Sequence, residues 1–209
     1  MSASLTVVDH PLVRHKVALL RDRAAAPATF RRTMRELGAL LLYEATRPLP
    51  LAETDIETPL ERGRFPTLAE VPCFVSILRA GNGLIDGMLD MLPDASVGHI
   101  GLYRDHETLE AIEYYFRIPD DIARRPVLVA DPMLATGHSA AAALSRLKQA
   151  GARRISFVCV LAAPEGARRL AETHPDVPVI AAALDRGLND KGYILPGLGD
   201  AGDRTYGTL

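Results

Sequence analysis

Between residues 73 and 183, short apolar runs alternate with segments whose apolar residues have helical spacing. Apolar runs this short suit strands that are buried on both faces. The expected strands are 97–103 with a hairpin-like return at 113–118, and 73–78, 127–130, 155–162 and 179–183; the expected helices are 84–91, a segment ending at 150, and 164–173. Because strands and helices alternate, the sequence predicts an α/β fold with a mostly parallel sheet flanked by helices.

Three regions are expected within one domain that spans residues 1–209. Helical spacing at 10–24 and 28–47 predicts N-terminal helices within 1–47. Residues 48–72 carry prolines and mixed charges without a sustained period, which predicts a long irregular arm with a short extended piece near Ile56. Residues 73–209 form the expected core.

Composition excludes several classes of protein. A net charge of −2 and a pI of about 6.3 argue against nucleic-acid binding through phosphate contacts, and the scattered Arg-Arg pairs, such as Arg168-Arg169, are expected to be solvated. We find no apolar run long enough for a signal peptide or a membrane span, and expect a cytoplasmic protein. The two cysteines, Cys73 and Cys159, lie in apolar runs and are expected to be buried.

The run 127–130 leads directly into a loop with an acid, small residues and hydroxyl groups, followed by a helical pattern. Unpaired N–H groups at a helix start bind phosphate, and Gly137 permits a close approach of the backbone. The loop lacks the glycine and lysine of a nucleotide triphosphate loop, and no G-x-G-x-x-G motif is present. A site for one phosphate remains, with Asp131 placed to meet sugar hydroxyls. The alternative is an ordinary strand-to-helix connection in which Ser139 only caps the helix, and the local sequence leaves both open.

Two arginines follow predicted strands. Arg79 comes after 73–78 and precedes Ala80-Gly81-Asn82-Gly83, and Arg104 follows 97–103. Ligands of parallel sheets bind at the carboxyl ends of the strands, so both arginines are expected near the phosphate loop, where they suit a polyanion.

The segment 192–203 has four glycines and one proline in twelve residues, which predicts a shaped loop rather than a helix. Such a loop presents backbone N–H and C=O groups that can bind the edge of a planar base, and uracil offers one donor between two acceptors. The apolar residues of this segment favour packing over a flexible tail. The six histidines are dispersed without metal-site spacing, and no nucleophile motif is found, so neither a protein-bound metal nor covalent catalysis is expected.

With these residues considered together, the chain resembles the uracil phosphoribosyltransferases. The segment 131–139 is similar to that family's loop for phosphoribosyl pyrophosphate (PRPP), and 192–202 is similar to its uracil loop. Further similar segments span the chain: His10-Pro-Leu-Val13, Tyr43-Glu-Ala-Thr46, Leu78-Arg-Ala-Gly81, Tyr103-Arg104 and Ala162-Ala-Pro-Glu-Gly166.

The resemblance implies a type I phosphoribosyltransferase fold and the reaction of uracil with PRPP to give UMP and pyrophosphate. It implies Asp131, Arg104 and Asp200 as catalytic residues. The implied PRPP-binding residues are Arg79, Arg104, Asp131, Pro132, Met133, Leu134, Ala135, Thr136, Gly137, His138, Ser139 and Asp200. The implied uracil-binding residues are Tyr193, Ile194, Gly199, Asp200 and Ala201. Mg²⁺ is expected to arrive on PRPP, held by substrate oxygens and waters rather than directly by the protein.

Other expectations follow from the same resemblance. A homo-oligomer, dimer or tetramer, and GTP as an effector are implied, and a non-catalytic regulator that binds UMP or PRPP is the alternative function. His138 stands where the family usually has a second glycine. If the backbone there requires a positive φ, histidine would be tolerated at some cost.

Overall fold

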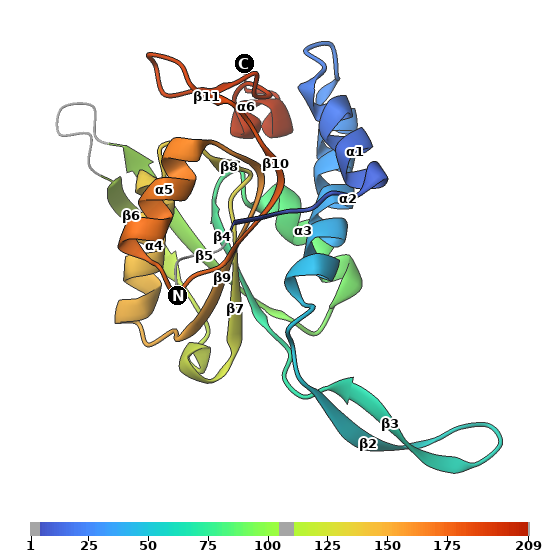
Figure 1. Cartoon of the computed structure of the whole chain (residues 1–209). Coiled ribbons are helices and arrows are strands. Elements are labelled where there is room, and N and C mark those ends of the chain that lie inside the picture. Colours follow the sequence, from blue (N-terminus) through green and yellow to red (C-terminus); the bar gives the residue numbers. More distant parts are fainter. Residues whose placement is uncertain (1–4, 105–110, 209) are drawn as a thin grey trace.

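A computed structural model describes residues 5–104 and 111–208, apart from the side chains of residues 104 and 111. The main strands are β1 Leu5–Val7, β4 Cys73–Leu78, β5 Ser96–Arg104, β6 Ala111–Arg117, β7 Pro126–Ala130, β8 Met133–Leu134, β9 Arg154–Ala162 and β10 Val179–Leu184. They form one sheet in the order β1-β10-β9-β7-β4-β5-β6, and β8 also pairs with β9 (Figure 1). All pairs are parallel except β5 with β6. The predicted α/β fold with a mostly parallel sheet is confirmed.

Helices cover both faces of the sheet (Figure 1). The helices are α1 Pro11–Arg21, α2 Pro27–Ala45, α3 Asn82–Met91, α4 His138–Gln149, α5 Pro164–Thr173, a short α6 Ala201–Tyr206 and a 3₁₀ turn at Ile122–Arg124. Successive strand residues face opposite sides, so Phe74 and Val158 pack with α1 to α3, while Val75 and Phe157 pack with α4 and α5. Each large apolar side chain buried in this way stabilises the fold by about 1.5–3 kcal/mol.

The arm differs from the prediction. Instead of an irregular connection, it is an antiparallel hairpin of β2 Leu51–Glu57 and β3 Arg62–Leu68, which extends away from the sheet (Figure 1). Both strands are largely exposed on both faces, so the sequence lacks the apolar alternation that reveals a strand with one buried face. A cross-strand ion pair joins Glu57 to Arg62, and the Thr54 and Thr67 hydroxyls lie 2.6 Å apart.

The segment 192–203 is a shaped loop over most of its length, as predicted, but its last residues begin a helix. Two short strands, β11 Gly187–Leu188 and β12 Ile194–Leu195, pair at its start, and α6 begins at Ala201. The expectation that no helix forms here was wrong at this end, because the Asp200 carboxylate accepts a hydrogen bond from Asp203 N at 2.8 Å and caps the helix.

Both cysteines are buried, as predicted. Burial raises the pKa of the Cys73 thiol to about 11, which keeps it protonated and unreactive at neutral pH. Of the helices in the described part, none combines the length and apolar character needed to cross a membrane.

Candidate active site

A pocket of about 200 Å³ opens at the carboxyl edge of the sheet, where β4, β5 and β7 are neighbours. Its lining consists of Ile77, Leu78, Arg79, Ala80, Leu102, Asp131, Ser139, Asp200 and Gly202. These residues come from several segments, and the first and last of them, 77–80 and 200–202, are more than a hundred positions apart in the chain. The pocket therefore brings together four predicted site residues: Arg79, Asp131, Ser139 and Asp200.

Asp131 directly follows β7 and is fixed by its own backbone. Its N–H donates to Val158 O at 3.1 Å, and its carboxylate accepts a hydrogen bond from Met133 N at 3.3 Å. Burial, with a smaller contribution from the negative charge of Asp200, raises the pKa of Asp131 to about 7 against the opposing effect of the Met133 amide. A carboxylate in this state gains from donors or a cation brought by a ligand, which is the usual condition of a binding or catalytic acid.

The first half of the predicted phosphate loop is part of the sheet. Pro132 O accepts hydrogen bonds from Val160 N and Leu161 N, and Met133 and Leu134 then pair with β9 as β8. The Leu134 side chain is fully buried in the core. Only backbone groups of Leu134 are therefore available to a ligand.

The second half of the loop has the geometry of an anion site. Gly137 is the N-cap of α4 and has φ of 78°. The position with the left-handed conformation is therefore occupied by glycine, which adopts it without strain. His138 is the first residue of α4, and its Nδ1 lies 3.0 Å from the Thr136 hydroxyl. The anticipated cost of a positive φ at His138 therefore does not arise. Ser139 is the second helical residue rather than the cap, and it is exposed at the pocket.

Helix α5 supports this loop through residues that the sequence did not indicate. Arg169 Nε donates to Thr136 O at 3.1 Å, so the expectation of a solvated Arg168-Arg169 pair was wrong for Arg169. A Cβ added at Gly166 would lie 2.5 Å from Ala135 O, which requires glycine for this close approach. Both contacts join segments about 30 residues apart, and no local pattern signals them.

Replacing Gly137 by alanine is expected to destabilise the fold by about 1–2 kcal/mol, because alanine is strained at positive φ. It should also raise KM for the phosphosugar that the resemblance implies as substrate, since the added methyl would press on Gly166 O at 3.1 Å and shift the loop. Gly151→Ala is the matched control, because Gly151 also has positive φ (97°) but lies in the turn after α4. Urea unfolding should show a loss for both variants, and steady-state kinetics a rise in KM only for Gly137→Ala. Equal KM values would contradict a role of this loop in phosphate binding.

Arg79 lies at the mouth of the pocket, where three groups of the chain's last helix hold it. Its Nη2 lies 3.1 Å from Asp203 Oδ1, its guanidinium stands 5.8 Å from the centre of the Tyr206 ring, and its carbonyl accepts the Tyr206 hydroxyl at 3.1 Å. The Thr208 hydroxyl and the Arg79 guanidinium hold the pKa of Asp203 below its ordinary value. Half of the Arg79 side chain remains exposed and available to an anion. Arg104 is the last residue of β5, and its side chain lies outside the described part.

The predicted base loop lies next to the phosphate loop. A Cβ added at Gly192 would lie 3.6 Å from Thr136 Cγ2, and one at Gly202 would lie 3.2 Å from Asp200 Oδ1 and 3.8 Å from Arg79 Nη2. Ile194 and Ala201 are buried in the core, so these two residues offer mainly backbone groups. Tyr193 is about half exposed and is absent from the pocket lining.

Two residues that the sequence did not single out, Arg21 and Asp185, make hydrogen bonds to the backbone of the base loop. Asp185 follows β10, and its carboxylate accepts two hydrogen bonds from Arg21, the last residue of α1. Both residues also contact Gly197 of the loop. Their positions, at the ends of a helix and of a strand, carry no signal in the sequence because the partners are 164 residues apart.

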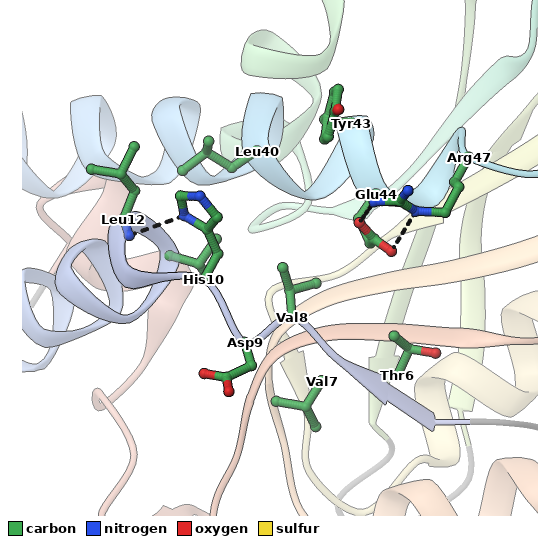
Figure 2. Close-up of a pocket in the computed structure, with 11 residues that line it drawn as sticks. Thr6, Val7, Val8, Asp9, His10, Leu12, Leu40, Tyr43, Glu44 and Arg47 are labelled. Carbon is green, nitrogen blue, oxygen red and sulfur yellow. Dashed lines mark hydrogen bonds and ion pairs between the residues drawn. The ribbon is translucent and has the colours of Figure 1, made fainter.

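A larger pocket, of about 530 Å³, lies between the segment after β1, the start of α1 and the end of α2 (Figure 2). It joins His10 and Leu12 to Tyr43 and Glu44, from two segments that carried the family resemblance. His10 Nδ1 accepts from Leu12 N at 3.1 Å, and Glu44 pairs with Arg47 at 2.8 Å. None of the predicted catalytic or substrate-binding residues lines this pocket, which separates it from the site at the carboxyl edge.

Comparisons with known proteins agree with this arrangement. A uracil phosphoribosyltransferase of Mesorhizobium japonicum is 60% identical over 98% of this chain and 98% of its own. Another from Acidovorax ebreus is 56% identical over 99% of each chain. The solved structure of the AQ2163 protein from Aquifex aeolicus has a TM-score of 0.93 at 40% identity and covers 97% of both chains. The adenine phosphoribosyl transferase of Trypanosoma brucei shares the fold, with a TM-score of 0.58 at 13% identity over 90% of this chain and 87% of that chain.

The family model described as uracil phosphoribosyltransferase matches residues 7–208, which include both loops, the arm and every strand of the pocket. The sheet, the residues gathered at its carboxyl edge and these similarities lead to one conclusion: the chain belongs to the uracil phosphoribosyltransferase family.

Proposed function

We propose that this protein transfers the 5-phosphoribosyl group of PRPP to N1 of uracil, giving UMP and pyrophosphate. The observation that carries the proposal is the convergence of Arg79, Asp131, Ser139 and Asp200 on one pocket at the carboxyl edge of the sheet. The resemblance to the family assigns this set to a phosphorylated sugar with an anionic leaving group. The alternative of a non-catalytic UMP- or PRPP-binding regulator is not favoured, since the family and its similar relatives are named for the transferase.

The phosphate side of the proposed site is the start of α4. The N–H groups from Thr136 to Ser139 and the positive end of the helix dipole bind the 5-phosphate, and Pro132 to Ala135 shape the approach. Asp131 then lies where the ribose hydroxyls follow the phosphate. Its raised pKa supports this role, because two hydroxyl donors would stabilise the ionised carboxylate that burial disfavours.

The leaving group defines the opposite side. Breaking the bond from the anomeric carbon to pyrophosphate leaves negative charge on pyrophosphate and positive charge on the ribose ring. Arg79, with Arg104 at the neighbouring strand end, stabilises the negative charge on pyrophosphate. Asp131 and Asp200 stabilise the positive charge on the ribose ring. The chain has no need of a covalent intermediate, since N1 of uracil bonds to the anomeric carbon as the bond to pyrophosphate breaks, pyrophosphate departs and the N1 proton is released to solvent.

The base side of the proposed site is the loop from Tyr193 to Ala201. Backbone groups of Ile194, Gly199 and Ala201, with Asp200, bind the O2, N3–H and O4 edge of uracil. Cytosine replaces one acceptor of this edge by a donor, and fixed amides would be left unpaired against it.

Mg²⁺ fits this pocket as a cation brought by PRPP. In the part of the chain that the structure describes, no three His, Cys, Asp or Glu side chains are grouped to hold a metal, but two carboxylates, Asp131 and Asp200, line the pocket. The carboxylates of Asp131 and Asp200 would face such a cation, and PRPP and water would supply most of its oxygen ligands. When bound, Mg²⁺ supplies positive charge that offsets the charge of pyrophosphate.

A product assay tests the function. Purified protein with Mg²⁺ and PRPP is expected to form nucleotide from uracil and not from cytosine, hypoxanthine or adenine, and EDTA is expected to abolish the activity. UMP formation should be followed by chromatography. Failure to form UMP, with or without GTP, would favour the regulator.

The remaining proposals concern assembly and control. We propose that the chain works as one domain of residues 1–209, in a dimer or tetramer, in the cytoplasm, with GTP as effector. The exposed hairpin supports an oligomer, because an isolated two-stranded hairpin is marginally stable in water and its apolar Leu51, Ile56 and Phe65 are exposed. Sedimentation of the purified protein, and the same product assay with GTP, test the two finer points.

A further inference from the structure

The backbone N–H and C=O of Gly197 are both bound by one partly buried ion pair, Arg21 with Asp185. Gly197 N donates to Asp185 Oδ2 at 2.9 Å, and Gly197 O accepts from Arg21 Nη1 at 2.8 Å. Arg21 and Asp185 are joined by two further bonds, Nη1 to Oδ2 at 2.9 Å and Nη2 to Oδ1 at 2.6 Å. The three residues therefore form a closed ring of hydrogen bonds.

The ion pair in this ring is more buried than the other ion pairs of the described residues. The Asp185 side chain is 5% exposed and that of Arg21 is 26% exposed. Burial alone would raise the pKa of Asp185, but the Arg21 guanidinium and the Gly197 amide outweigh it and the pKa is lowered. A charge pair in such a place contributes mainly geometric definition, since the cost of removing both charges from water offsets their attraction.

The ring is anchored on both sides. Asp185 N donates to Ala162 O at 2.8 Å, which ties it to the end of β9, the strand that also pairs with β8 of the phosphate loop. A second arginine, Arg204, donates to Leu198 O at 2.7 Å and to the carbonyls of Leu20 and Asp22 on either side of Arg21. The loop residues directly before Gly199 are thus bound to the end of α1 and to the sheet.

Glycine is the only residue type that fits at position 197. Its φ is 66°, and a Cβ would lie 2.1 Å from Ile194 O. Two residues later come Gly199, Asp200 and Ala201, whose backbone groups are assigned to uracil above. A small rotation of the Gly197 peptide would therefore displace these groups relative to Asp131, whose own position is set by β7 and β9.

We propose that Arg21 and Asp185 are positioning residues for the nucleobase: they fix the Gly197 peptide and so set the distance of the base loop from the phosphoribosyl half of the site. The inference rests on the proposed binding of uracil by this loop. Neither residue lines the pocket, so their effect on the base is exerted through Gly197.

The test compares Asp185→Asn and Arg21→Lys with wild type. Asparagine retains an acceptor for Gly197 N but loses the charge, and lysine retains the charge but cannot bind Asp185 in fork geometry and Gly197 O together. Each variant is expected to raise KM for uracil about tenfold and to weaken UMP binding similarly, with KM for PRPP within about twofold of wild type. Arg21→Lys preserves the charge balance, so it stays informative if Asp185→Asn does not fold.

Asp90→Asn is the matched control, because Asp90 forms a two-bond pair with Arg35 between α2 and α3 that is about half exposed. It should leave both KM values unchanged. Folded variants with wild-type KM for uracil, or with uracil and PRPP affected equally, would overturn the inference.

Gly199→Ala, at φ of 82°, separates this inference from the site proposal. If it raises KM for uracil while the ring variants do not, only the positioning role fails. If Gly199→Ala also leaves KM for uracil unchanged, the assignment of uracil to this loop fails, and the positioning role falls with it.

Discussion

Replacing Asp131 by asparagine is expected to lower kcat/KM for PRPP by about 10²–10³-fold, the usual loss when one preorganised charged group is removed from a transition state. Asparagine has the same shape and retains an acceptor for Met133 N, so the backbone of the loop should be preserved. The loss would therefore report the charge opposite the ribose ring. Initial rates of UMP formation at varied PRPP measure it.

The pH dependence of the same variant gives an independent check. Because the pKa of Asp131 is raised to about 7, kcat/KM of the wild type should increase as the pH rises through that value and the carboxyl ionises. The asparagine variant should lack this rising limb of the pH profile of kcat/KM, while it retains any limb due to ionisation of PRPP. A limb near pH 7 that persists in the variant would assign the titration to another group.

Above pH 7, Asp131→Asn should raise the thermal stability of the fold while it lowers the activity. The folded pKa of Asp131 lies above the unfolded value of about 3.9, so the stability contributed by its protonated form is complete below that pH and is lost as the pH rises through about 7. Asparagine avoids this loss. At pH 8 the variant should melt above the wild type, by about 2–4 °C for each kcal/mol gained, and at pH 3.5 the advantage should vanish.

Asp176→Asn is the control for the activity measurements, since Asp176 pairs with Lys148 at the surface. Its replacement should change neither kcat nor the rise of kcat/KM near pH 7.

Replacing Arg79 by alanine is expected to reduce kcat by about 10²-fold or more, because a cation opposite the leaving group acts mainly in the transition state. Thermal stability should change little, since the pair with Asp203 is partly exposed and such pairs contribute at most about 1 kcal/mol. Steady-state rates at saturating uracil and PRPP measure the effect.

Arg146→Ala is a matched control for Arg79. Arg146 also combines an ion pair, to Glu113 at 3.0 Å, with an aromatic contact, 3.9 Å from the centre of the Phe116 ring, but it joins α4 to β6 and does not line the pocket. Its removal should leave kcat near that of the wild type. If Arg79→Ala raises KM for uracil and leaves kcat intact, Arg79 serves the base rather than pyrophosphate.

The sequence predicted the parts of this fold that depend on local pattern. Strand β4 and helix α5 were predicted with the bounds observed, because β4 is a short apolar run buried on both faces and α5 has apolar residues at helical spacing. The pocket was predictable in outline for a similar reason: Arg79 and Asp131 follow parallel strands, and the carboxyl ends of such strands meet at one edge.

What the sequence did not predict depends on contacts between distant segments. The hairpin β2–β3 lacks a buried face, so its strands have no apolar alternation. Arg169 supports Thr136, and Asp185 binds Arg21, through side chains whose neighbours in sequence say nothing of their partners. The capping of α6 by Asp200 was masked by the glycines around it, which made a loop the simpler prediction.

The two halves of the site also differ in how they can assemble during folding. The supports of the phosphate loop, Asp131 with Val158 and Thr136 with Arg169, close chain segments of about 30 residues, whereas Arg21 with Asp185 closes one of 164 residues. Longer loops cost more entropy to close and form later unless other contacts shorten them. Under the proposed assignment of the two loops, the phosphate loop can therefore become native first and the base loop last, when Arg21 and Asp185 meet.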